Sequence, residues 1–231
     1  MKKFTKVALI LATIFFMVGV CCVIGAIAHG VTWGVFDNMV KDGKFSFGIT
    51  KEELDMADSQ MDEITEKCSN LDIELRAGVL EIQYNDVEHI EVAQLDIPGY
   101  ECYVKDGTLH IEGGRTVGLN NNEGRILITI PTDYVFEEVD LQIGAGKATI
   151  EMLKAKEFEV EVGAGQLTMT IPGVASDYNY ELECGVGKIQ VGNEHISGIG
   201  NEKEVINPDA TKHFSVECGA GNVEIRFLEE I

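Results

Sequence analysis

From Leu71 onward, apolar and polar residues alternate in short runs, and glycine-rich bends interrupt the alternation. The complete unit is an alternating run, a Gly-x-Gly bend and a second alternating run, as in VDLQIGAGKATI from Val139, FEVEVGAGQLTM from Phe158, YELECGVGKIQV from Tyr180 and FSVECGAGNVEI from Phe214. A weaker copy, LDIELRAGVLEI from Leu71, has Arg76 in place of the first glycine. A period of two is that of a β-strand with one buried face. Repeated units of this kind are typical of a stacked all-β fold in which neighbours complete each other's core.

The apolar positions of each copy are expected to point the same way and form the core. In two of the copies they are Val139, Leu141, Ile143, Ala148, Ile150 and Met152, and Phe158, Val160, Val162, Leu167, Met169 and Ile171. The outward positions before the bends are largely acidic, namely Asp72, Glu74, Asp140, Gln142, Glu159, Glu161, Glu181, Glu183, Ser215 and Glu217. We interpret this face as solvated, with weak calcium or magnesium association as the alternative, because hard cations prefer clustered carboxylates. The spacing of these residues matches no known metal-binding loop, so no metal site is predicted.

The bend glycines are interpreted as structural, because glycine supplies positive φ and lets neighbouring chains approach closely. They are Gly78, Gly144, Gly146, Gly163, Gly165, Gly185, Gly187, Gly219 and Gly221. A phosphate-binding loop would open a helix and continue with a Lys-Ser/Thr pair, whereas Lys147 is followed by Ala148 and another strand. The longest interval between bends contains Gly192 to Ala210, which predicts a surface loop suited to a specific contact.

Residues 7–28 form an apolar run of 22 residues without a charge, which predicts a transmembrane helix that also contacts membrane lipid. Lysines precede this run and none follows until Lys41, so the positive-inside rule places residues 1–6 in the cytoplasm and the C-terminal domain outside it. Two alternatives are a cleaved signal peptide ending at Ala28 and, less favoured because Val20 precedes Cys21, a lipoprotein. Residues 29–70 are expected to be a juxtamembrane linker, and residues 71–231 the repeat domain.

The linker has a capping-box pattern at Thr50 and Glu53, followed by apolar residues at spacings of three and four, namely Leu54, Ala57, Met61, Ile64 and Cys68. This pattern predicts one amphipathic helix. An irregular lead-in to the repeat domain is the alternative.

The composition is strongly acidic, with 39 Asp and Glu against 18 Lys and Arg and a formal net charge of −21. Nucleic acid is therefore excluded as a partner, and anionic polymers would be repelled unless a cation bridges the two. Partners left open are an envelope protein, a cell-surface polymer and a second copy of the chain.

Four cysteines lie outside the apolar run: Cys68, Cys102, Cys184 and Cys218. Cys184 and Cys218 occupy the same position before the bend in consecutive copies, so they could stack about 4.8 Å apart, within reach of a disulfide. The alternative is that both are small buried apolar side chains.

Catalytic motifs are missing from the sequence. The five histidines are scattered singly, and neither a G-x-S-x-G nor an H-E-x-x-H motif is present. No catalytic residue, cofactor site or enzymatic activity is therefore predicted. Carbohydrate binding is disfavoured because Phe158, Tyr180, Phe214 and Phe227 fall on the inward register.

The recurrent h-x-h-x-h-Gly-Ala-Gly-x-h-x-h units after an N-terminal apolar helix resemble a family of bacterial candidate adhesins with β-strand repeats, a domain family without an assigned function. The resemblance covers Leu71 to Phe227. It implies a right-handed β-solenoid or β-helix, and some members are encoded near regulators of envelope stress. The family has no established catalytic residues. We therefore expect a membrane-anchored, extracytoplasmic, adhesin-like binding or scaffold module. Two alternatives are an accessory regulator of an envelope stress response and a polysaccharide hydrolase.

Overall fold

The computed structural model describes residues 60–114 and 124–228, which form an all-β unit. Its strands are β1 (Gln60–Ile64), β2 (Asn70–Asn85), β3 (Ile90–Leu95), β4 (Glu101–Lys105), β5 (Thr108–Gly113), β6 (Arg125–Pro131), β7 (Phe136–Ile150), β8 (Ala155–Pro172), β9 (Tyr178–Val191), β10 (Glu194–Val205) and β11 (Lys212–Leu228). One turn of 3-10 helix, Ala175–Asp177, precedes β9. The all-β expectation is confirmed for these residues.

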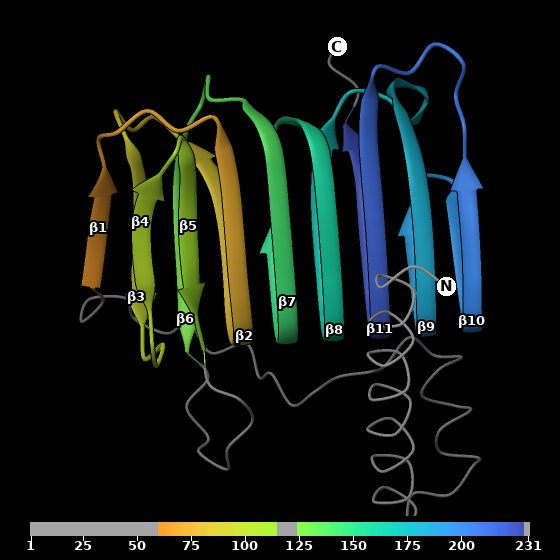
Figure 1. Ribbon diagram of the computed structural model, residues 1–231, viewed down its shortest axis with the longest axis horizontal. Helices are drawn as coiled ribbons and strands as arrows, with labels where there is room; N and C mark the ends of the chain where they lie inside the picture. The colour runs from red at the N-terminus through yellow and green to blue at the C-terminus, as the bar shows by residue number, and fades with distance from the viewer. Residues whose placement is uncertain (1–59, 115–123, 229–231) are drawn as a thin grey trace, which may run out of the picture. The chain divides into compact units, whose positions relative to one another are not determined.

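The strands form one open sheet in the order β1-β3-β6-β2-β7-β8-β11-β9-β10, with the hairpin β4-β5 attached to β2 (Figure 1). The five long strands β2, β7, β8, β11 and β9 are the five copies of the repeat. They run parallel and pair residue for residue, bend against bend. The register therefore places equivalent positions of every copy in straight rows across the sheet.

Each long strand folds back on itself at its glycine bend. A straight strand of the 15 residues of β7 would extend about 50 Å. Yet only four residues separate the end of β7 from the start of β8, and Ala155 of β8 pairs with Phe136 at the start of β7. The sheet is thus doubled, as Figure 1 shows where the strands run down the front and return behind. We call the halves before the bends, with β4, β5 and the second half of β10, the front layer, and the rest the back layer.

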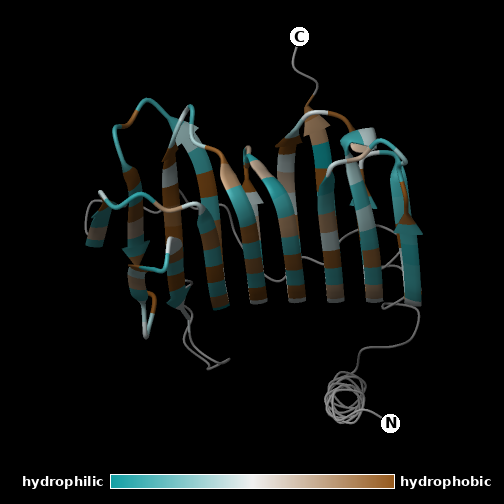
Figure 2. Ribbon diagram, turned by 45° about the horizontal axis from the view of Figure 1, so that its top comes forward, coloured by the Kyte–Doolittle hydropathy of each residue, from teal (hydrophilic) through white to brown (hydrophobic). Residues whose placement is uncertain are grey.

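The core lies between the two layers and consists of the inward apolar positions of both. The predicted ladders of β7 and β8 are buried from Val139 to Ile150 and from Phe158 to Ile171, and the alternating bands in Figure 2 follow this pattern. Met152 follows the end of β7 and is not part of the buried cluster. Burial of each large apolar side chain stabilises the fold by about 1.5–3 kcal/mol. Packing between the layers therefore holds the doubled sheet together.

The predicted bend glycines form two lines across the sheet, where neighbouring backbones approach closely. In the first line are Gly144, Gly163, Gly219 and Gly185; in the second are Gly78, Gly146, Gly165, Gly221 and Gly187. A Cβ on Gly163 would lie 2.7 Å from the carbonyl oxygen of Gly144. Gly146 has φ 139°, and a Cβ there would collide with the carbonyl oxygen of Gly78. Side chains are excluded along both lines.

Arg76 of β2 stands in the first line, where the other copies have glycine, and the geometry of the neighbouring strand explains this difference. Each glycine of the first line meets the carbonyl of the preceding strand in the order β2, β7, β8, β11, β9. Arg76 would meet the strand before β2, but β5 ends at Gly113, opposite Leu75. A side chain is therefore tolerated at Arg76. Gly78 is not exempt, because a Cβ there would lie 2.7 Å from the carbonyl oxygen of Gly124.

The strand order differs from a stack that follows the sequence. β11, the last copy in the chain, lies between β8 and β9, so the second and third complete copies are not neighbours. The predicted surface loop between Gly192 and Ala210 is also wrong, because Glu194–Val205 form β10, which pairs antiparallel with β9 along both layers. The glycines and charged residues of this segment give no alternation of apolar and polar residues, and its strand conformation comes from pairing with β9.

The predicted linker helix is wrong where the structure describes it. Gln60–Ile64 form β1, antiparallel to β3 with Ile64 opposite Ile90, and the sheet therefore begins before Leu71. Met61 is 61% exposed, so the three-and-four spacing was not a buried helix face. Pairing with β3 overrides the local pattern. The remaining residues of that helix, Thr50 to Ala57, lie outside the described residues.

Among the residues that the structure describes, none forms a helix of the length and apolarity needed to cross a bilayer. The predicted transmembrane segment, residues 7–28, lies outside the described ranges, as do its alternatives.

Candidate functional site

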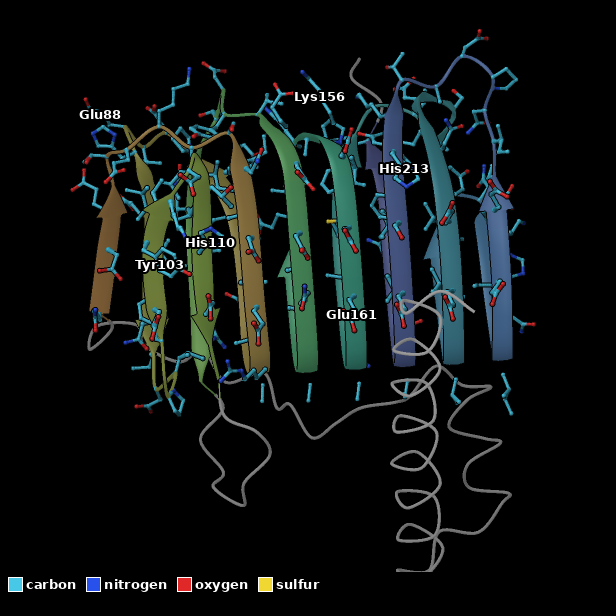
Figure 3. The ribbon with its side chains drawn as sticks, viewed as in Figure 1. Glu88, Tyr103, His110, Lys156, Glu161 and His213 are labelled. Atoms are coloured by element: carbon cyan, nitrogen blue, oxygen red, sulfur yellow. The ribbon has the colours of Figure 1, made fainter. Side chains whose placement is uncertain are left out.

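The outer surface of the front layer carries a row of glutamates that crosses eight strands. In strand order β4, β5, β2, β7, β8, β11, β9, β10, the residues in register are Glu101, Glu112, Glu74, Gln142, Glu161, Glu217, Glu183 and Glu202. We call this the glutamate row; Glu161 lies near its middle in Figure 3. Neighbouring strands are about 4.8 Å apart. The row is therefore about 34 Å long.

A second row lies two residues away on the same strands. It contains Tyr103, His110, Asp72, Asp140, Glu159, Ser215, Glu181 and Glu204. We call the two rows together the acidic face. It has seven carboxylates in the glutamate row and five in the second. Basic groups near it include His110, which belongs to it, Lys203 on β10, and Arg76, whose Nε lies 3.1 Å from a carboxylate oxygen of Glu74.

Burial and mutual repulsion both act on the carboxylates of the acidic face. Burial, followed by the charges of Glu161 and Glu159, raises the pKa of Glu217 above its ordinary value. Burial, followed by the charges of Glu217 and Glu202, raises the pKa of Glu183 in the same direction. The ionised forms of these two carboxyl groups are therefore disfavoured, and a nearby positive charge or protonation of one carboxylate would offset that cost.

A hollow of about 330 Å³ lies where the acidic face crosses β11, β9 and β10. Its carboxylates come from both rows, namely Glu181, Glu183, Glu202, Glu204 and Glu217. The intervening residues Leu182, Lys203 and Val216, with Ser215, complete the lining. Lys203 is itself ion-paired with Glu194. The hollow is thus a shallow polar trough between the two rows.

The opposite end of the acidic face carries an aromatic pair, with Tyr103 on β4 and His110 on β5. Tyr103 and His110 stack with their ring centroids 5.0 Å apart, and both are labelled in Figure 3. The Tyr103 hydroxyl donates to Glu112 at 3.1 Å, and His110 Nδ1 lies 2.8 Å from Asp72 Oδ2. This group would be missed from sequence, because Asp72 and His110 are 38 residues apart and meet only through strand register.

The back layer presents a different surface, on which several of the charged side chains form ion pairs. Arg226 lies 2.8 Å from Glu224, and Arg125 lies 3.5 Å from Glu81. Threonines occupy neighbouring strands at Thr149 and Thr168. The doubled sheet therefore has one acidic side and one mixed polar side.

The sequence-predicted acidic positions all lie on the acidic face, but the prediction stopped at five strands. Glu101, Glu112 and Glu202 extend it at both ends through the hairpin β4-β5 and through β10. The turn Asp106-Gly107 and the alternating residues around it were the available signal for the first extension. The charged and glycine-rich sequence of β10 gave no comparable signal for the second extension.

No group of three or more His, Cys, Asp or Glu side chains within residues 60–114 and 124–228 is arranged to hold a metal ion. The two cysteines of the candidate disulfide, Cys184 and Cys218, lie opposite each other on β9 and β11 and are free thiols in the structure.

Comparison with known proteins finds matches to solved structures at low sequence identity. No family model and no curated protein matches the chain. A crystal structure of a candidate cell adhesion protein from Clostridium sporogenes has 16% identity over 74% of this chain and 100% of its own, with a TM-score of 0.39. A candidate adhesin from Bacteroides fragilis has 14% identity over 78% of this chain and 98% of its own, with a TM-score of 0.36. A candidate lipid binding protein from Parabacteroides distasonis has 13% identity over 74% and 68%, with a TM-score of 0.36.

Proposed function

We propose that the protein is a non-enzymatic, adhesin-like binding module that presents its acidic face to a cationic surface or an extended cationic polymer. The glutamate row carries this proposal, because seven of its eight positions place a carboxylate in register. In the same proposal the N-terminal apolar helix anchors the module in the membrane. The repeated units act as a solenoid-like stack that holds the face rigid on the extracytoplasmic side.

Binding explains the repetition of the row better than catalysis does. General acid-base catalysis needs two groups whose environments push their pKa values apart. For Glu183 and Glu217, both pKa values are instead shifted upward, by burial and by neighbouring carboxylates. The glutamate row instead offers many equal contacts, and its carboxylates are not separated into an acid and a base. Such contacts suit an extended partner that carries repeated positive charge.

Electrostatic complementarity also predicts how the binding should behave. Contacts between exposed charges are screened over about 10 Å at 0.1 M salt. Affinity for a polycation should therefore fall steeply as salt is added, with association steered by the long-range field of the face. The mixed polar side of the sheet, where Arg226 and Arg125 are ion-paired with glutamates, should contribute little.

The test uses full-length protein in lipid nanodiscs and a fluorescent oligolysine as the probe. The triple variant Glu161→Gln, Glu183→Gln and Glu217→Gln removes the centre of the glutamate row. The control, Glu66→Gln, Glu88→Gln and Glu151→Gln, removes the same charge from exposed positions outside the acidic face. We expect the row variant to bind on the order of 10-fold more weakly at low salt, and the control to bind nearly as the parent does. Equal losses in the two variants would show that net charge, not the row, attracts the probe, and would refute the proposal.

A further inference from the structure

The position of β11 depends on contacts with two strands that the chain has already completed. β11 pairs in parallel with β8 from His213 to Leu228 and with β9 from Lys212 to Ile225. It is the last strand in the sequence, yet it occupies an interior position in the sheet. Among the described residues no disulfide joins β11 to a neighbouring strand, so its covalent link to the sheet is the connection that follows β10. A cross-link to either neighbour would hold it in place.

Cys184 on β9 and Cys218 on β11 are placed for such a cross-link, because they lie directly opposite each other. Adjacent strands are about 4.8 Å apart, within the range of Cα separations of about 4.4–6.8 Å that disulfides span. In-register residues of parallel strands project to the same side, and both side chains are 0% exposed in the core. The two sulfurs therefore share one buried environment.

The two thiols also interact. A hydrogen bond from Cys218 lowers the pKa of Cys184. The same interaction, together with burial, raises the pKa of Cys218. Loss of the first proton from the pair is thus easier than loss of the second. The two sulfurs thus lie within hydrogen-bonding distance of each other when β11 is docked.

We propose that Cys184 and Cys218 are a cross-linking site, at which an intrachain disulfide locks β11 between β8 and β9. The required oxidant is a disulfide. The Cys184 thiolate attacks one of its sulfurs, forms a mixed disulfide and releases the other sulfur as a thiolate. The Cys218 thiolate then displaces the remaining oxidant sulfur and forms the Cys184–Cys218 bond. The oxidant gains two electrons and the two thiol protons, and leaves as two thiols.

Burial sets the time at which this reaction occurs. The oxidant cannot reach sulfurs that are 0% exposed, so exchange takes place while β11 is still docking or after it has locally opened. The remaining described cysteines do not compete. Cys102 pairs with Ile111 on β4 and β5, whereas Cys68 precedes β2 and is hydrogen-bonded to Tyr134. Through Ile111, Cys102 lies level with Ile73 of β2, which is five residues from Cys68. This separation is about 16 Å along the strand, so Cys68 and Cys102 are too far apart to pair with each other.

The first experiment identifies the bond. Full-length protein is unfolded with reductant, refolded in a mixture of reduced and oxidised glutathione, quenched in acid, and alkylated under denaturing conditions. Peptide mass spectrometry is expected to find Cys184 linked to Cys218, with Cys68 and Cys102 alkylated. Alkylation of all four, or linkage to another cysteine, overturns the proposal. Refolding a mixture of isotope-labelled and unlabelled chains separates the intrachain bond from exchange between copies, since hybrid linked peptides would overturn the intrachain lock.

The second experiment tests whether the bond stabilises the docked strand. The urea midpoint of the refolded parent is expected to fall on the order of 1 M when reductant is added. The Cys218→Ala variant controls for altered packing, because only its response to reductant is compared, and that response should be absent. Cys102→Ala should respond as the parent does. An unchanged midpoint in the reduced parent would contradict a stabilising lock.

Discussion

At the scale of single residues, carbonyl oxygens decide where side chains are forbidden. The two glycine lines exist because each strand's carbonyl points at the Cα of the next strand at the bend. The sequence shows these positions as a repeated Gly-x-Gly, and strand register turns the repetition into two continuous lines. Arg76 shows that the requirement comes from the neighbouring strand and not from the bend itself, since β5 ends beside it.

Substitution of Gly146 by alanine is expected to cost at least about 3 kcal/mol of stability or to prevent folding, because the new Cβ would overlap the carbonyl oxygen of Gly78 at φ 139°. The control is Gly99→Ala, at φ 67° with no atom within 4 Å of the new Cβ. It should cost about 1 kcal/mol, from backbone conformation alone. Urea unfolding followed by circular dichroism measures both. Similar losses in the two variants would show that close approach is not the cause.

At the scale of elements, local pattern predicted the strands with strong alternation and failed for those that depend on a partner. β7 and β8 were recognisable from their apolar ladders, and their burial agrees. β1 had helix-like spacing and β10 a loop-like composition, and both are strands because β3 and β9 supply hydrogen-bonding edges. The place of β11 could not be predicted, because equivalent copies have equivalent faces and any of them could have been its neighbour.

The loop between β10 and β11 carries the chain back across the sheet, and Asn207 holds it. The Asn207 side-chain amide donates to the carbonyl of Tyr178 at 2.6 Å and to that of Ala175 at 3.3 Å. Its backbone N–H donates to the Asn179 side chain at 2.7 Å. Asn207→Ala is expected to lower stability by about 1–2 kcal/mol, because two partly buried carbonyl acceptors lose their donor.

Asp209→Ala, an exposed position in the same loop, serves as the control and should change stability by less than about 0.5 kcal/mol. Thermal unfolding of both variants distinguishes them. If Asn207→Ala unfolds as the parent does, the loop does not hold β11 in its interior position.

At the scale of the whole sheet, the fold separates a core from two unlike outer sides. The inward and outward assignment of the repeats was available from the sequence, and so was the acidic character of the front layer. Its continuity over eight strands was not, because it depends on the register of β4, β5 and β10 with the repeats. The pairing of His110 with Asp72 has the same origin.

The acidic face also makes the stability of the fold depend on pH. The pKa values of Asp140, Glu183 and Glu217 are raised by burial and by neighbouring carboxylates. A carboxyl group with a raised folded-state pKa binds more protons in the folded state than in the unfolded state. Its contribution to stability is therefore fully present below the ordinary pKa of about 4 and is lost as pH rises through the raised value.

We therefore expect the urea midpoint to be higher at about pH 5 than at pH 7, with the gain reduced in the variant Glu183→Gln, Glu217→Gln. Glu66→Gln, Glu88→Gln provides the control at exposed positions outside the acidic face and should retain the dependence. A midpoint that rises from pH 5 to pH 7 in the parent would show that other groups dominate.

The interior position of β11 has a consequence for the chain during its synthesis. Every residue up to Thr211 is made before the strand that separates β8 from β9, so a nascent chain has two extra unpaired edges in the middle of its sheet. Unpaired edges attract other strands, and proteins that are still being made are crowded together on polysomes. The sheet therefore passes through its most aggregation-prone stage just before it is complete, and a chaperone that shields these edges would protect it most if it stayed bound until β11 had emerged.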